Sequence, residues 1–200
     1  KFKKYIQLFQ KNEFYYFFIF RFIGGLGVPF FLQNVFPVLF DMKKINYFFS
    51  NFFHVSEVIK LKLKKKFKII SALSVFYDLR EPNKFLRHVK ELLDEKGIFI
   101  LEHADLYMII KNQIFDTICH EHLGFFSSKV IIEMIRNTGL KVFHHEYNDI
   151  NGGSSRYYIC HKNAHYKVKG SIKKVLLNEK KVGLHSKKIF TNFFNDILNQ

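Results

Sequence analysis

Acidic residues, cysteine, proline and tryptophan are all scarce in this chain of 200 residues. It has 17 Asp and Glu against 32 Lys and Arg, with 2 Cys, 3 Pro and no Trp. The two cysteines, Cys119 and Cys160, are too few for a disulfide framework or a four-thiolate zinc site, and they favour a reducing, cytoplasmic location. The formal net charge of +15 excludes an acidic protein and makes polyanions (nucleic acid, phospholipid, nucleotide-linked substrates) candidate partners.

Hydrophobic sequence is abundant, above all in the first quarter of the chain. Hydrophobic residues form 48% of the total, which is enough for a folded core. Residues 14–40 are almost wholly apolar, and this length permits a membrane span. Arg21, Pro29 and Pro37 interrupt the run, so a buried strand, a glycine turn and a second apolar segment are favoured over membrane contact.

A basic run, KLKLKKKFK, occupies residues 60–68. A cluster of like charges is usually a solvated face or loop, and we favour that interpretation over nucleic-acid binding. We therefore expect no nucleic-acid partner.

The middle of the chain alternates between strand and helix patterns. The β-branched and aromatic run at 67–76 predicts a buried strand. Apolar residues at helical spacing within 85–97 predict a helix that ends at Gly97, and residues 98–102 predict the next strand. Strand, helix and strand in about 35 residues form a βαβ unit, hence a parallel α/β sheet.

Three further elements follow. The segment SSKVIIEMIRNTG predicts a helix that is capped by Ser127 or Ser128 and ends at Gly139. LKVFHHEYND and SSRYYICHK predict two strands around the Asn-Gly-Gly turn at 151–153. A last helical pattern, IFTNFFNDIL, lies near the C-terminus.

Residues 115–127, FDTICHEHLGFFS, hold the densest cluster of ionisable groups. An imidazole is suited to removing a proton near neutral pH, and a neighbouring carboxylate stabilises its charged form. A zinc site is an alternative because Cys, His and Glu are all ligands, although HEH lacks the helical HExxH spacing. Ordinary surface or core histidines are a third interpretation, and these residues by themselves leave all three open.

Two glycine-containing segments could also bind a ligand. In INGGSSR, residues 150–156, the glycines allow close backbone approach and the arginine could clamp a phosphate, but a tight hairpin turn is the simpler explanation. The cluster GGLG at 24–27 follows an apolar run, as nucleotide-binding turns do, without their full spacing.

Together, DTICHEHLGFFS and the later INGGSSRYYI resemble the sugar C-methyltransferases that use S-adenosylmethionine. The family pattern reads FDTIYHEHLSYFS and then HGGSLR, in the same order. The resemblance covers residues 67–195. It implies a Rossmann-like class I methyltransferase sheet, α/β in class, that runs into the start of a C-terminal α/β domain.

Carried over position by position, the resemblance makes His122 the general base and Glu121 its acidic neighbour. Cys119 stands where the family has a catalytic Tyr, which removes a hydroxyl. The residues that match the family's GGS-R element, and that would bind the substrate and its phosphates, are Gly152, Gly153, Ser154 and Arg156.

The family's cofactor motif, EIGSNDG, would fall on residues 22–28, so Gly24, Gly25 and Gly27 would bind S-adenosylmethionine. The motif's acidic residue and its Asn-Asp pair are missing here.

We expect a methyltransferase domain over residues 1–165, diverged over 1–66, and the truncated start of a C-terminal domain over 166–200. The implied activity is methyl transfer to carbon on a nucleotide-linked keto-deoxysugar. One alternative is an inactive remnant that binds a partner or a membrane surface through 14–40 and 60–68. Another is a different small-molecule methyltransferase on the same fold.

Overall fold

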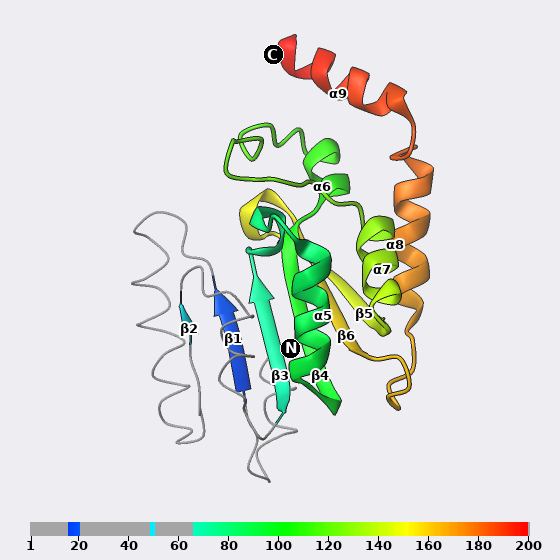
Figure 1. The fold of residues 1–200 in the computed structure, drawn as a ribbon. Helices are drawn as coiled ribbons and strands as arrows, with labels where there is room; N and C mark the ends of the chain where they lie inside the picture. The colour runs from blue at the N-terminus through cyan, green and yellow to red at the C-terminus, as the bar shows by residue number, and fades with distance from the viewer. Residues whose placement is uncertain (1–15, 21–48, 51–65, 200) are drawn as a thin grey trace.

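The structure is a computed structural model that describes residues 16–20, 49–50 and 66–199. Six strands form one sheet in the order β2-β1-β3-β4-β6-β5 (Figure 1). The strands are β1 Tyr16–Phe20, β2 Phe49–Ser50, β3 Phe67–Leu73, β4 Leu93–Ala104, β5 Leu140–Asn148 and β6 Ser154–His161. The helices are α5 Pro82–Leu92, α6 Leu106–Lys111, α7 Ser128–Asn137, α8 Gly170–Lys181 and α9 Lys187–Leu198, with 3-10 turns η2 Phe76–Asp78 and η3 Ile150–Gly152.

Most of the sheet is parallel, as the sequence predicts. β1 pairs in parallel with β2 and with β3, and β3 pairs in parallel with β4. β6 is antiparallel to both of its neighbours, β4 and β5. β1 lies within the apolar run 14–40, in agreement with the strand interpretation, and the remainder of that run lies outside the described residues. Among the described residues, no helix has the length and apolar character needed to cross a membrane.

The predicted βαβ unit is confirmed as β3-α5-β4, but its helix ends earlier than expected. The sequence predicts an end at Gly97, whereas α5 ends at Leu92 and β4 begins at the next residue. The reason is the pairing with β3, where an ion pair of 2.5 Å joins Lys68 to Asp94. A Cβ atom on Gly97 would lie 2.8 Å from the Phe67 carbonyl oxygen, so this glycine allows the two strands to approach closely.

The second half of the chain also follows the local patterns. Ser127 caps α7 by accepting a hydrogen bond from the Val130 N–H, and Gly139 follows the helix with a φ of +81°. β5 and β6 form the predicted hairpin around the glycine turn, and α9 matches the last helical pattern.

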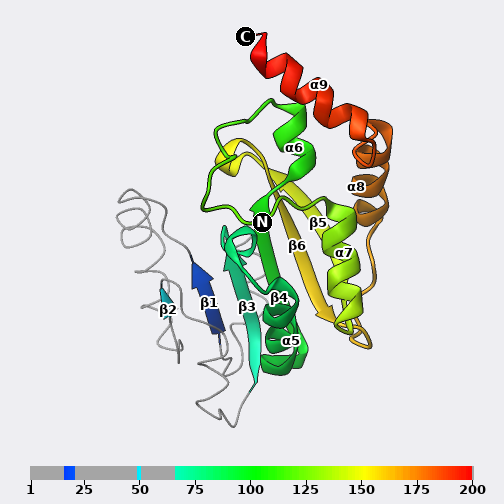
Figure 2. The same ribbon diagram turned by 45° about the horizontal axis from the view of Figure 1, so that its top comes forward.

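One hydrophobic core lies between the sheet and the two helices α5 and α7. It includes Ile70 and Leu101 from the sheet, Leu86 from α5 and Ile131 from α7, all fully buried. α8 packs against β5 and α7. Figures 1 and 2 show α5 and α7 on the same face of the sheet, with α9 extending beyond α8 near α6. At the carboxyl edge of the parallel strands lie η2, which follows β3, and α6, which follows β4.

Candidate functional site

The carboxyl ends of β1, β3 and β4 lie at one edge of the sheet. Phe20 is paired with Leu73, and Leu73 with Glu102, so β1 and β3 end at the same level and β4 continues to Ala104. Just beyond them, the Ser74 N–H donates a 2.9 Å hydrogen bond to the Glu102 carbonyl. In open parallel sheets, ligands bind outside this edge. The edge is therefore where the predicted site residues should gather.

The loop that carries the predicted base, residues 112–126, is attached to this edge through its backbone. The N–H groups of Leu123 and Gly124 both donate to the Tyr77 carbonyl, at 2.8 and 3.0 Å. Tyr77 belongs to η2, which follows β3. The loop is thus tied directly to the end of a central strand.

The His122 side chain is half-buried and has a defined orientation. Its Nδ1 atom lies 2.7 Å from the Thr117 carbonyl oxygen, and its ring centroid lies 4.4 Å from that of Tyr77. A carbonyl oxygen only accepts hydrogen bonds, so Nδ1 carries a proton, and in the neutral imidazole Nε2 is the nitrogen with the free electron pair. This is the tautomer that a general base at Nε2 requires.

The other two predicted catalytic residues are exposed on the same loop. Cys119 is a free, exposed cysteine whose carbonyl accepts the His122 N–H at 3.2 Å. Glu121 is exposed at the position just before the imidazole. The described residues contain no group of three or more His, Cys, Asp or Glu arranged to hold a metal ion.

The second predicted constellation packs against the segment that leads into the base loop. Gly152 and Gly153 have φ values of +77° and +143°, which side-chain-bearing residues rarely adopt. The Asn112 amide donates a 3.0 Å hydrogen bond to the Gly152 carbonyl. A Cβ atom added to Gly152 would lie 2.7 Å from the Ile114 side chain. One added to Gly153 would lie 2.8 Å from the Met108 side chain. The structure thereby brings the two constellations to the same edge.

Replacement of Gly153 by Ala should destabilise the fold. The added methyl group meets Met108 and the backbone there is strained for a residue with a side chain, so we expect a loss of about 2–4 kcal/mol of unfolding free energy. Gly170→Ala is the matched control, because nothing lies within 4 Å of its Cβ position. Urea unfolding followed by circular dichroism measures both variants, and equal midpoints would refute this role of Gly153.

The remaining two predicted substrate-binding residues already have partners in the protein. The Ser154 hydroxyl donates to the Ile150 carbonyl at 2.8 Å. Arg156 forms an ion pair with Glu102, to which its Nε donates at 2.7 Å. Burial lowers the pKa of Arg156, but the neighbouring Glu102 carboxylate more than offsets this and leaves the pKa raised. The arginine side chain retains 21% exposure.

A buried polar network behind the edge is not evident from the sequence. Asp105, which caps α6, accepts a 2.7 Å hydrogen bond from Ser155, and Ser155 contacts His145 Nε2 at 2.8 Å. The Ser128 and Tyr157 hydroxyls are 2.7 Å apart in the same region. Burial lowers the pKa of His145 to about 4, so this imidazole is neutral at pH 7. Of this network, only the helix cap has a signal in the sequence, because Asp105 immediately precedes an apolar helical run.

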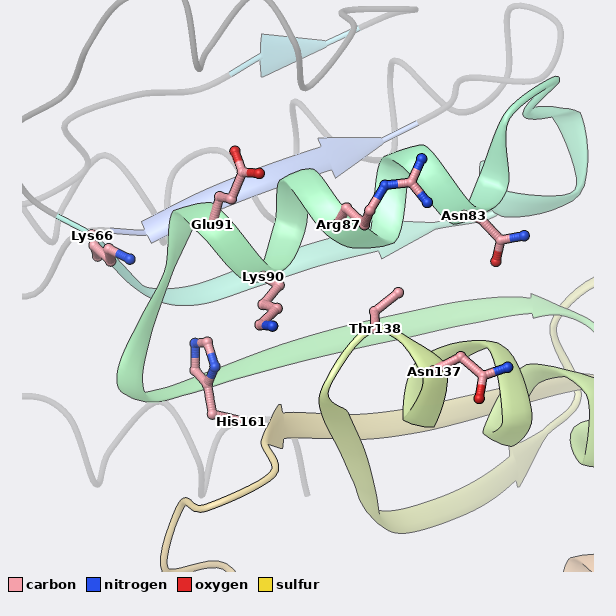
Figure 3. Close-up of a pocket in the computed structure, with 8 residues that line it drawn as sticks. All are labelled: Lys66, Asn83, Arg87, Lys90, Glu91, Asn137, Thr138 and His161. Atoms are coloured by element: carbon pink, nitrogen blue, oxygen red, sulfur yellow. The ribbon is translucent and has the colours of Figure 1, made fainter.

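A basic cavity of about 640 Å³ lies elsewhere, between α5 and the end of α7 (Figure 3). Its lining residues are Lys66, Asn83, Arg87, Lys90, Glu91, Asn137, Thr138 and His161. In Figure 3, Lys90 points toward His161 and Thr138, while Glu91 points to the other side of the helix. The Lys90 ammonium lies close to Gly139, since a Cβ atom added to this glycine would be 2.9 Å from Nζ. Gly139 comes just after the C-terminal end of α7, where the helix dipole favours a cation. The cavity contains none of the predicted site residues.

No known protein-family profile matches the chain. The sequence is 27% identical over 117 residues to the C-methyltransferase NovU of Streptomyces niveus, a match that covers 58% of this chain and 28% of NovU. The structure is similar to the magnesium protoporphyrin IX methyltransferase of Synechocystis PCC 6803, solved with bound SAH, with a TM-score of 0.50, 12% identity and coverage of 78% and 77% of the two chains.

The structure is also similar to a second solved structure, the complex of a methyltransferase with the Trm112 methyltransferase activator of Haloferax volcanii. It has a TM-score of 0.53 and 13% identity, over 82% of this chain and 89% of that one. At these identities the likeness establishes the fold alone. The chain has the α/β, Rossmann-like fold of class I methyltransferases.

Proposed function

We propose that the chain is an S-adenosylmethionine-dependent C-methyltransferase domain that acts on a nucleotide-linked keto-deoxysugar. The similarity to NovU over 117 residues and the methyltransferase fold support the reaction type. The observation that carries the proposal is the hydrogen bond from His122 Nδ1 to the Thr117 carbonyl, because it leaves Nε2 basic at the carboxyl edge.

His122 Nε2 takes the proton from the carbon next to the ketone, and the electron pair of the broken C–H bond forms the enolate. When bound, S-adenosylmethionine would supply the methyl group for transfer to this carbon, with a neutral thioether as the leaving group. The imidazolium holds the proton until solvent removes it. Glu121 stabilises that charge, and the Cys119 thiol lies on the same loop.

The sheet fits a cofactor at this edge. β1 ends at Phe20, level with the end of β3, so the segment that follows it begins at the carboxyl edge. That segment contains Gly24, Gly25 and Gly27, which lie outside the described residues and which we assign to the cofactor. The turn from Gly152 to Arg156 would face the anionic part of the substrate, with the remaining N–H groups of Arg156 as donors.

The test is product formation from S-adenosylmethionine with a deuterated methyl group and a thymidine-diphospho keto-sugar. Mass spectrometry should find the labelled methyl group on carbon next to the ketone. Cofactor binding without transfer to any such sugar would favour another small-molecule methyltransferase. Failure to bind S-adenosylmethionine in calorimetry would favour the inactive binding module.

A further inference from the structure

Tyr77 contacts the candidate base from outside the base loop. It lies in η2, and only 3% of its surface is exposed. Its ring centroid lies 4.4 Å from that of His122, with an angle of 57° between the planes. The ring of Phe125 is more distant from His122, at 6.2 Å. Tyr77 is therefore packed directly against the imidazole.

The backbone of Tyr77 holds the same loop. Its carbonyl accepts hydrogen bonds from the N–H groups of Leu123 and Gly124, the two residues after His122. Side chain and main chain of one residue thus act on both the ring of the base and the backbone that carries it.

Tyr77 is itself fixed to the sheet. The turn η2 is closed by a 3.1 Å hydrogen bond from the Asp78 N–H to the Val75 carbonyl. Directly before it, the Ser74 N–H binds the Glu102 carbonyl of β4 at 2.9 Å. The contact to His122 therefore starts from a rigid element, which is what precise positioning of a reacting group requires.

The base loop has little packing between Phe115 and Leu123, whereas Phe125 and Phe126 at its end pack against buried clusters. Phe115, Ile118 and Leu123, three of its large apolar side chains, are 54%, 55% and 55% exposed. Within the loop, His122 is held at Nδ1 by Thr117. This hydrogen bond selects the Nδ1–H tautomer only while the imidazole stays in the plane that brings Nδ1 to the Thr117 carbonyl.

We propose that Tyr77 is the positioning residue for His122: its carbonyl fixes the loop and its ring fixes the plane of the imidazole, so that Nε2 faces the substrate. This inference rests on the proposed function of His122 as the base. The aromatic ring makes the contact with His122, and Tyr77→Phe keeps this ring whereas Tyr77→Leu removes it. Both replacements keep the main-chain carbonyl, so they test the ring alone.

The experiment compares Tyr77→Phe and Tyr77→Leu with the wild type in two measurements. The first is the tautomer of His122, read from long-range ¹H–¹⁵N correlations of histidine-labelled protein. The second is the separation of kcat from KM in the methyl-transfer assay. Tyr166→Leu is the matched control, since it removes a tyrosine stacked on Phe143, at 4.8 Å between ring centroids, away from the base loop.

We expect Tyr77→Leu to lower kcat by about ten- to a hundredfold, the scale of a small misplacement of a reacting group, with KM changed less than about threefold. Its His122 should show a mixture of tautomers, while Tyr77→Phe and Tyr166→Leu keep the Nδ1–H form and the wild-type kcat. Wild-type tautomer and kcat in Tyr77→Leu would overturn the proposal, as would an equal loss in Tyr77→Phe.

If Tyr77→Leu does not fold, nuclear Overhauser contacts between the two rings in the wild type decide the matter, and their absence contradicts positioning. The tautomer measurement needs no substrate. A wild-type protein that transfers no methyl group, but in which Tyr77 controls the tautomer, would therefore refute the proposed function and leave the positioning intact.

Discussion

His122→Asn should lower the rate of methyl transfer by about a hundredfold or more, while the protein remains folded. Loss of a general base has this scale. Asn retains an amide that can donate to the Thr117 carbonyl in place of Nδ1–H, so the loop should keep its conformation. Steady-state kinetics with a thymidine-diphospho keto-sugar, together with a thermal melt, measures both effects.

His120→Asn is the matched control for this variant. His120 is an exposed imidazole on the same loop, two positions before the candidate base. We expect its replacement to leave the rate within about twofold, as for surface substitutions away from a site. Equal losses in the two variants would mean that the loop needs its histidines for a reason other than a base at His122.

Arg156→Ala should produce the second large effect, on stability as well as on substrate affinity. Glu102, which is 3% exposed in the wild type, would lose its ion-pair partner, and breaking a buried pair in this way costs about 3–5 kcal/mol. Asn148 donates to the same carboxylate at 2.9 Å, but an amide does not neutralise the charge. Chemical denaturation measures the loss, and Arg156→Lys should recover only part of it, because a single ammonium group does not reproduce the two guanidinium nitrogens that contact Glu102 Oε2.

The double variant Glu102→Gln/Arg156→Ala separates the structural role of the arginine from its proposed role in substrate binding. Removal of the carboxylate charge should restore most of the stability. The KM for the nucleotide-linked sugar should stay raised, with unchanged affinity for S-adenosylmethionine. A wild-type KM in the stable double variant would assign Arg156 to the ion pair alone.

Those parts of the fold that depend on neighbouring residues were predictable. The cap at Ser127, the glycine after α7 and the hairpin turn are properties of short segments, and each lies where the pattern indicates. The end of α5 was not predictable from its own segment, because it depends on the contacts of β4 with Phe67 and Lys68, which lie far away in the sequence. The residues after Leu92 retain helix propensity, but the tertiary pairing with β3 makes them part of β4 instead.

The same limit applies to the site. The base loop and the glycine turn were recognisable as motifs, and the structure brings both to the carboxyl edge of the sheet. Their partners come from other strand ends, Tyr77 after β3 and Glu102 in β4, and no spacing in the sequence connects them to His122 or Arg156. Contacts of this kind depend on the order of strands in the sheet, which sequence periodicity does not contain.

Exchange of hydrogen for deuterium at the substrate carbon next to the ketone, in heavy water and without S-adenosylmethionine, tests the central claim most directly. It isolates removal of the proton from transfer of the methyl group. We predict that the wild-type protein catalyses this exchange and that His122→Asn does so at least about a hundredfold more slowly. Exchange at the wild-type rate in His122→Asn would contradict the assignment of His122 as the base.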